Sequence, residues 1–141
     1  MTSDRMARSY LAQAAYRLGE VERAIRDAQH AIAVWRSQEA VELALKAALR
    51  AAGVEPPHWH DVGEVLLASA SRLPLELRKV VADLARISAD LRQDREAAFY
   101  GDEVVGRAPD EIYDEADARR AQGDASFVVE RVGRALGPSH P

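Results

Sequence analysis

The sequence predicts an all-α fold, an antiparallel up-and-down bundle of four main helices and one short helix. Apolar residues recur at steps of three and four, as the buried face of a helix requires, and no stretch alternates with the period of two typical of a strand. Hydrophobic residues form 48% of the 141 residues and charged residues 30%, which suits one buried core with a solvated surface. We therefore expect a single domain over residues 1–141.

Residues 4–52 are predicted to form the first two helices. This segment contains no proline and one glycine, Gly19, and it is rich in residues that favour helices. As one rod it would be roughly 70 Å long, too long for a domain of this size. The apolar stripe also changes phase at residues 27–30, so we place a tight turn there. The first stripe is Ala7, Leu11, Ala14, Leu18, Val21, Ile25 and Ala28, and the second is Ala31, Val34, Gln38, Val41, Leu45, Ala48 and Ala52.

A short helix and the third main helix are expected after Gly53, a residue well suited to end the second helix. Pro56 and Pro57 keep the residues that follow out of a helix. Asp61 can cap the short helix, and Pro74 suits the first turn of the third main helix. The apolar positions are Val62, Val65, Leu66 and Ala70 in the short helix, and Leu77, Val81, Leu84, Ile87 and Leu91 in the long one.

The last main helix is expected after a loop over residues 101–109. Acidic residues crowd its start, where the helix dipole favours negative charge, and it ends near Gly137 and Pro138. Its inner face is mostly alanine, so each contact removes little apolar area from water, and a partner subunit would add burial. The acidic residues are Asp110, Glu111, Asp114 and Glu115, and the inner face is Ala118, Ala121, Ala125, Val128 and Val132.

Charge and composition exclude several classes of protein. The formal net charge of −4 argues against a protein that coats duplex nucleic acid, although it leaves room for a local basic site. Because cysteine is absent, disulfides, thiolate metal ligands and cysteine nucleophiles are excluded. The sequence has neither an apolar run of membrane-spanning length nor a signal-peptide pattern. We therefore expect a cytoplasmic protein that makes no membrane contact.

The second helix carries a recognisable motif, AVWRSQEAVELALKAAL over residues 33–49. This motif resembles the signature of the HEPN family, small helical domains of prokaryotes. The agreement continues in order along nearly the whole chain, through Gly53, His60-Asp61, Arg95, Tyr100-Gly101, Pro109, Tyr113 and the alanine-rich last helix.

The resemblance implies a helical bundle that usually forms a homodimer and is associated with binding of nucleotides or RNA. Many members are encoded beside a small nucleotidyltransferase in toxin-antitoxin pairs. Active members are metal-independent ribonucleases with an arginine followed a few residues later by a histidine. The matching positions here are Arg95 and Tyr100, so a tyrosine stands where the histidine would be.

The chemistry of these two residues favours binding over cleavage. An arginine can stabilise the charge that develops on phosphate, but cleavage also requires a base and an acid. A tyrosine phenol ordinarily keeps its proton at neutral pH, so it donates a hydrogen bond or stacks on a base rather than acting as a general base. A ribonuclease that uses Arg95 with Tyr100 in place of histidine is the alternative. An ion pair of Arg95 with Asp or Glu at the end of the bundle is the purely structural reading of that residue.

Helix geometry sets a condition on this pair. Five residues turn an ideal helix through about 500°, which leaves Arg95 and Tyr100 roughly 140° apart around the axis. For both to reach one ligand, either the helix ends before Tyr100, as Gly101 would allow, or a second subunit completes the site. Phe99, four residues after Arg95, is the side chain aligned with it.

Three polar residues of the second helix complete the predicted ligand site. Gln38 interrupts an apolar stripe, so it needs a hydrogen-bond partner inside the bundle, and we expect a structural contact more often than a ligand there. Glu42 and Lys46 have the spacing that favours an ion pair on a helix surface. Since such a pair stabilises a helix little, we expect both side chains to face the interior groove or the dimer interface.

Other residues carry weaker indications, and we predict neither a metal ion nor a cofactor. His58 and His60 form an HxH pair, but no third ligand is fixed by spacing. The acidic residues 110–117 are explained by the start of a helix. Trp35 and Trp59 are expected to anchor the core and a loop, because neither has arginine-rich surroundings. A third hypothesis, a bundle that serves only as a dimerisation or docking module, needs none of these sites.

Overall fold

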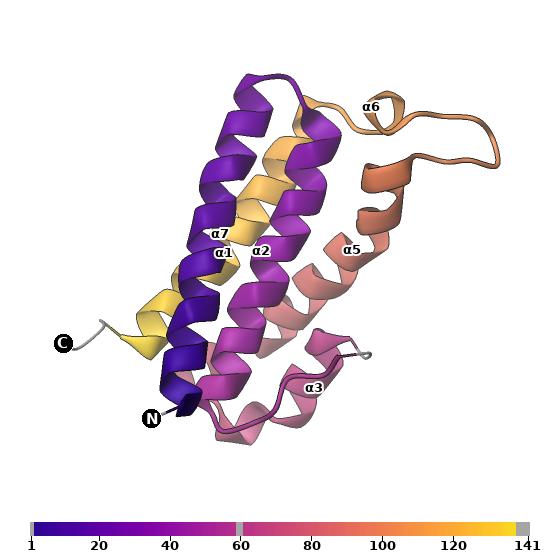
Figure 1. Ribbon diagram of the computed structural model, residues 1–141. Helices are drawn as coiled ribbons and strands as arrows, with labels where there is room; N and C mark the ends of the chain where they lie inside the picture. Colours follow the sequence, from indigo (N-terminus) through magenta and orange to yellow (C-terminus); the bar gives the residue numbers. More distant parts are fainter. Residues whose placement is uncertain (1, 59–60, 138–141) are drawn as a thin grey trace.

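The fold is an up-and-down helical bundle, shown in Figure 1 for the computed structural model, which describes residues 2–58 and 61–137. Within these ranges, the chain has no β-strand and only an isolated bridge between Asp102 and Arg107. The predicted all-α fold is therefore confirmed. The long helices are α1 (Thr2–Arg26), α2 (His30–Ala51), α5 (Val81–Tyr100) and α7 (Glu115–Leu136). The short ones are α3 (Val62–Ala68), the 3-10 turn η1 (Ala70–Arg72), α4 (Leu75–Arg78) and α6 (Pro109–Ile112).

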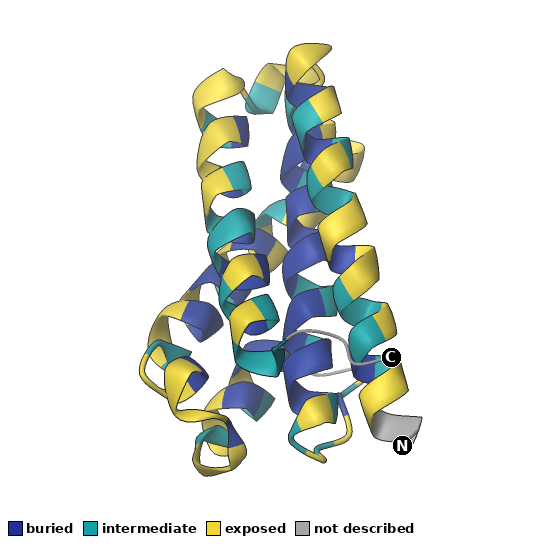
Figure 2. Ribbon diagram, turned by 90° about the vertical axis from the view of Figure 1, so that its left-hand side faces the viewer, coloured by how far each residue is buried: buried dark blue, intermediate teal, exposed yellow. Residues whose placement is uncertain are grey.

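Helix α2 is the central helix, because α1, α5 and α7 all pack against it. Figure 2 shows that buried residues lie on the inward faces of the helices and exposed residues on the outward faces. The predicted inner face of α7, from Ala118 to Val132, is buried as expected. In α1 the residues Ala7 and Val21 are fully buried, whereas Leu11 is half-buried. A helix held on three sides presents its remaining side chains at fixed positions.

The turn between α1 and α2 lies where the phase change predicts it, between Arg26 and His30. Ala28 has a φ of 59° and is exposed, so its assignment to the first buried stripe is wrong. A left-handed conformation costs an alanine about 1–2 kcal/mol, which the packing of the two helices outweighs. That is why neither glycine nor proline marks this turn.

Gly53 ends α2 as predicted, in a Schellman motif. Its φ is 77°, its N–H donates to the carbonyl of Arg50 at 3.0 Å, and the N–H of Val54 donates to the carbonyl of Leu49 at 2.8 Å. The chain then runs back as an extended loop, which brings His58 towards α2 and α5.

Two predicted helices are each split in the structure. The helix expected from Pro74 to Arg95 is interrupted at Lys79 and Val80, a turn between α4 and α5, and Ala70 lies in η1 rather than in the short helix. This path buries both Leu73 and Leu77, a tertiary gain that outweighs local helix propensity.

The helix expected from Asp110 is also divided, because Tyr113 is extended between α6 and α7. The Tyr113 hydroxyl donates to the carboxylate of Asp94 at 3.0 Å and to the Asp94 carbonyl at 3.2 Å, which ties this junction to α5. Asp114 then caps α7 by accepting from the N–H of Asp117 at 2.9 Å.

Both described ends of the chain lie at the same end of the bundle (Figure 1). Arg8 of α1 donates to the carbonyls of Leu136 and Gly137, the last turn of α7. In the part of the chain that the structure describes, no helix is long and apolar enough to cross a membrane.

Candidate functional site

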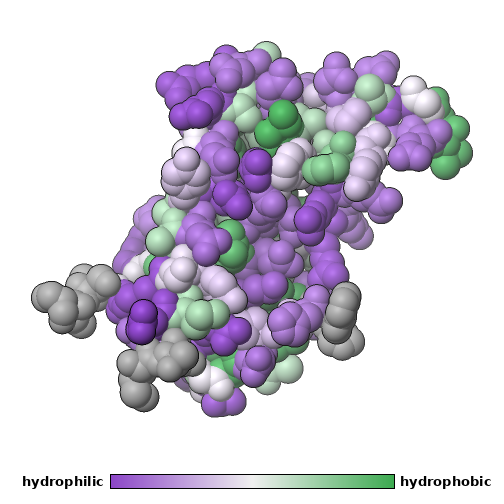
Figure 3. Space-filling model, viewed as in Figure 1, coloured by the Kyte–Doolittle hydropathy of each residue, from purple (hydrophilic) through white to green (hydrophobic). Residues whose placement is uncertain are grey.

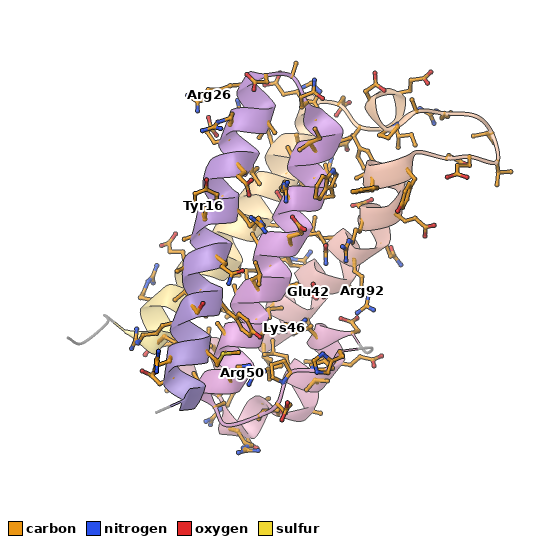
Figure 4. All side chains as sticks on the ribbon, in the orientation of Figure 1. Tyr16, Arg26, Glu42, Lys46, Arg50 and Arg92 are labelled. Atoms are coloured by element: carbon orange, nitrogen blue, oxygen red, sulfur yellow. The ribbon has the colours of Figure 1, made fainter. Side chains whose placement is uncertain are left out.

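A groove of about 590 Å³ opens between α2 and α5 and is closed at one end by the loop before α3. Figure 4 shows Glu42 and Lys46 on α2 and Arg92 on α5 at the two sides of this groove. All five residues that the sequence proposes for ligand binding line it. The lining residues are Gln38, Glu42, Lys46, His58, Arg92, Arg95, Glu96, Phe99 and Tyr100.

The α2 wall follows from helical spacing. Gln38, Glu42 and Lys46 are four residues apart, so they share one face and span about 12 Å along the axis. Gln38 is buried, with an exposed fraction of 4%, while Glu42 and Lys46 are half-buried. Both charged side chains line the groove between the helices, in agreement with the expectation that they face a groove.

The α5 wall is a second helical stripe. Arg92, Arg95, Glu96 and Phe99 follow the i, i+3, i+4, i+7 pattern of one face, and all four are exposed. Tyr100 also reaches the groove although α5 continues through it, and its ring lies 4.6 Å from that of Phe99. The two conditions set by helix geometry are thus unnecessary, because one chain brings both Arg95 and Tyr100 to the groove without an earlier helix end.

The charges of the groove have no partners within the described chain. Lys46, Arg92 and Arg95 form no ion pair with any described residue, and Glu42 forms none either. The Glu42–Lys46 pair that the spacing favours is therefore not made, and no Asp or Glu of residues 2–58 and 61–137 pairs with Arg95.

On the face formed by α1 and α2, in contrast, two arginines form ion pairs. There Arg17 and Arg36 pair with Glu20 and Glu39 at 2.8–4.0 Å. Ion pairs thus hold Arg17 and Arg36, whereas Lys46, Arg92 and Arg95 are three cations in one groove without such a pair among the described residues, as are Arg23 and Arg26 on the exposed side of α1.

Gln38 has an unsatisfied buried atom at the groove. Its Oε1 is shielded from solvent, and no donor among the described residues reaches it. The neighbouring buried Ser37 uses its hydroxyl on the carbonyl of Ala33 at 2.7 Å. A buried acceptor without a donor costs about 1–3 kcal/mol, so it calls for a hydrogen bond from outside the protein. The internal structural partner expected for Gln38 is not present among the described residues.

The aromatic residues gather at one end of the groove. Trp35 of α2 lies 5.2 Å from Phe99 of α5 between ring centroids, and Phe99 in turn contacts Tyr100. The guanidinium of Arg36 lies 4.3 Å from the centre of the Trp35 ring. Trp35 packs against the core as expected, and the side chain of the next residue folds back over its ring.

Sequence reasoning missed Arg92, Glu96 and His58. Arg92 is the i−3 neighbour of Arg95, and Glu96 follows Arg92 at i+4, so both could have been found by extending the stripe by one turn. His58 could not, because only the return of the loop after Gly53 brings it to the groove.

A second cleft of about 310 Å³ lies between α5 and α7 and is lined by acidic residues and by Tyr113. Burial, together with the Asp94 carboxylate, raises the pKa of Tyr113. Burial also raises the pKa of Asp124, against the opposing effect of Arg86. These shifts are explained by packing and by hydrogen bonds that hold the helices together.

The weaker metal candidates are only partly covered by the structure. His60 and Trp59 lie outside the described residues, as does Pro138 at the predicted end of α7. Over residues 2–58 and 61–137, no three His, Asp or Glu side chains come close enough to hold a metal ion. Asp114 and Asp117 bind each other's N–H groups at the start of α7, as helix capping predicts.

Comparison with known proteins identifies the family. Neither curated proteins nor solved structures give a significant match. The family model described as HEPN domain matches residues 7–135, which include α2 and α5 in full, most of α1 and α7, and every residue of the groove. With nearly the whole chain matched, this protein belongs to the HEPN domain family.

Proposed function

We propose that the groove between α2 and α5 binds a nucleotide or a short segment of RNA, and that the protein does so as a homodimer. The observation that carries this proposal is the meeting of unpaired cations, exposed aromatic rings and an unsatisfied amide in one groove. Cations attract phosphate, aromatic rings stack on bases, and an amide pairs with a base edge.

Binding of a labelled single-stranded RNA and of AMP in metal-free buffer tests the proposal. We expect Arg92→Ala and Arg95→Ala each to weaken binding several-fold, because each removes a cation that attracts phosphate. For the RNA, the slope of log affinity against log salt should also become shallower by about 0.7 for each cation removed. Arg86→Ala is the matched control, since Arg86 lies on the same helix but outside the groove and pairs with Asp83 and Asp90.

Equal affinity for the wild type and both groove variants would refute the proposed site. Absence of any binding, with folding intact, would instead favour the hypothesis of a dimerisation or docking module.

The homodimer is supported by exposed apolar residues on the loop between α5 and α6. Val104 is 95% exposed and Val105 63% exposed. Figure 3 shows hydrophobic surface at the tip of this projecting loop. Apolar side chains at such exposure gain most from burial against a second copy. The further partner that we propose, a separately encoded nucleotidyltransferase in a toxin-antitoxin-type pair, rests on family membership, and co-purification with the product of an adjacent gene tests it.

Metal-independent cleavage of RNA is a second candidate, favoured by one observation. His58 lines the same groove as Arg95 and Tyr100, so an imidazole is available although α5 carries none. Incubation of labelled RNA in chelator distinguishes the two functions. Binding without cleavage is the result that our proposal expects. Cleavage that is lost in both Arg95→Ala and His58→Ala would establish the ribonuclease instead.

A further inference from the structure

The unsatisfied amide of Gln38 suggests what kind of ligand the groove takes. Gln38 lies on the central helix α2, where the backbone N–H groups are engaged within the helix, and the hydroxyl of Ser37 is already used. No described residue donates to Oε1. A water molecule or a ligand in the groove can bring a donor to this atom. In a nucleotide, the donors are the ribose hydroxyls and the amino group of the base, and only the amino group lies beside an acceptor on one planar edge.

The order of residues along the groove gives the ligand a direction. α2 and α5 run antiparallel, and the contact between Trp35 and Phe99 fixes their relative position. Gln38 comes one turn after Trp35, whereas Lys46 lies two turns further on, near the loop that carries His58. The aromatic rings and the amide thus occupy one end of the groove, and positive charge extends from Arg95 and Arg92 towards Lys46.

We propose that Gln38 recognises the base of the bound nucleotide and that the groove takes nucleotides whose base presents an amino group, with the phosphate towards Lys46. This assignment rests on the proposed function. On binding, the amide turns so that Oε1, which is shielded in the free protein, accepts a hydrogen bond from the amino group, and the NH2 of the same amide donates to the adjacent ring nitrogen. Adenine offers this donor and acceptor side by side, which is the usual pairing of glutamine with a base. Phe99 and Tyr100 supply the aromatic faces against which the base stacks.

The experiment compares three ligands that differ by one feature each. AMP carries the amino group, purine riboside 5′-monophosphate lacks it, and ribose 5-phosphate lacks the base. Titration calorimetry measures each with the wild type, with Gln38→Met, and with Gln93→Met as the control. Gln93 is exposed on α5 and lines the other cleft, so its substitution leaves the groove intact.

We expect the wild type and Gln93→Met to bind AMP about tenfold more tightly than purine riboside 5′-monophosphate, the effect of one hydrogen bond. In Gln38→Met the two should bind equally, while affinity for ribose 5-phosphate stays unchanged. The wild-type comparison alone tests the assignment if Gln38→Met does not fold.

Two failures can be told apart. Equal binding of AMP and purine riboside 5′-monophosphate by the wild type would overturn the role of Gln38 and leave phosphate binding in place. Absence of binding by all three ligands would overturn the proposed function and this assignment together.

An oligouridine that ends in adenosine, compared with one that ends in uridine, distinguishes the end of an RNA chain from a free nucleotide as the source of the base. A preference for the adenosine end supports the same role for Gln38 on RNA, and equal binding confines that role to free nucleotides.

Discussion

Gln38 and Arg95 are groove residues whose positions can be predicted from the sequence and whose contacts cannot. Their positions in the groove follow from the helical register, which the sequence displays directly. That neither has a partner among the described residues does not follow from the register, because an ion pair or a hydrogen bond depends on which other helix lies opposite. The spacing of Glu42 and Lys46 favours an ion pair that the structure does not make, since both side chains turn into the groove instead.

The carboxyl group of Asp124 is expected to make the stability of the protein depend on pH. Burial raises the pKa of Asp124, with Asp90 acting in the same direction and Arg86 and Arg120 opposing it. The protonated form is therefore the one that folding favours, so this stabilisation is present below the unfolded-state pKa and is lost as pH rises through the folded-state value. Asp124→Asn mimics the protonated form. We expect it to melt at a higher temperature than the wild type at pH 7, with the difference shrinking towards pH 4. A variant less stable than the wild type at pH 7 would contradict this.

The junction of α6 with α7 is held to α5 by a hydrogen bond whose contribution to stability can be measured. The Tyr113 hydroxyl is the hydrogen-bond link from this junction to Asp94 on α5. We expect Tyr113→Phe to lower the free energy of unfolding by about 0.5–1.5 kcal/mol in urea, the net value of such a bond. Tyr16→Phe is the control, because Tyr16 is 69% exposed and should change stability little. Equal effects of the two substitutions would show that the link contributes nothing.

The end of α5 depends on Gly101, which follows the aromatic residues of the groove. Its φ is 79°, and a Cβ there would overlap the carbonyl oxygen of Arg107. Gly106 also has a positive φ, of 72°, but open space around it. We expect both alanine variants to lose about 1–2 kcal/mol for the left-handed backbone, and Gly101→Ala to lose clearly more. Equal melting temperatures for the two variants would argue that the α5–α6 loop adjusts freely.

Element boundaries mark the limit of what the sequence predicts. The sequence itself marks both ends of α2. The phase change of the apolar stripe locates the turn before the helix, and Gly53 locates its end. The breaks at Val80 and Tyr113 have no such marker, because burial of Leu77 and the bond of Tyr113 to Asp94 come from other parts of the chain. These are tertiary effects that override helix propensity.

The bundle as a whole follows from periodicity, whereas the groove follows from which helices face each other. The apolar stripes predict four packed helices but not that α2 and α5 leave a cavity between them. Nor does the sequence predict that the loop after Gly53 brings His58 to the groove.

Assembly is tested at this scale by light scattering with size-exclusion chromatography. We expect the wild type to elute with the mass of a dimer and Val104→Asp/Val105→Asp to shift towards the monomer, because a charge at each position penalises burial. A dimer that survives both substitutions would place the interface elsewhere on the molecule.

The most direct test of the central claim is to map where AMP binds, by the amide chemical shifts of isotopically labelled protein during a titration. We predict shift changes concentrated in α2 around Gln38 and Lys46 and in α5 from Arg92 to Tyr100, with little change around Asp124 in the cleft between α5 and α7. Shift changes centred on that cleft, or spread over the α1–α2 face, would contradict the assignment of the groove as the nucleotide site.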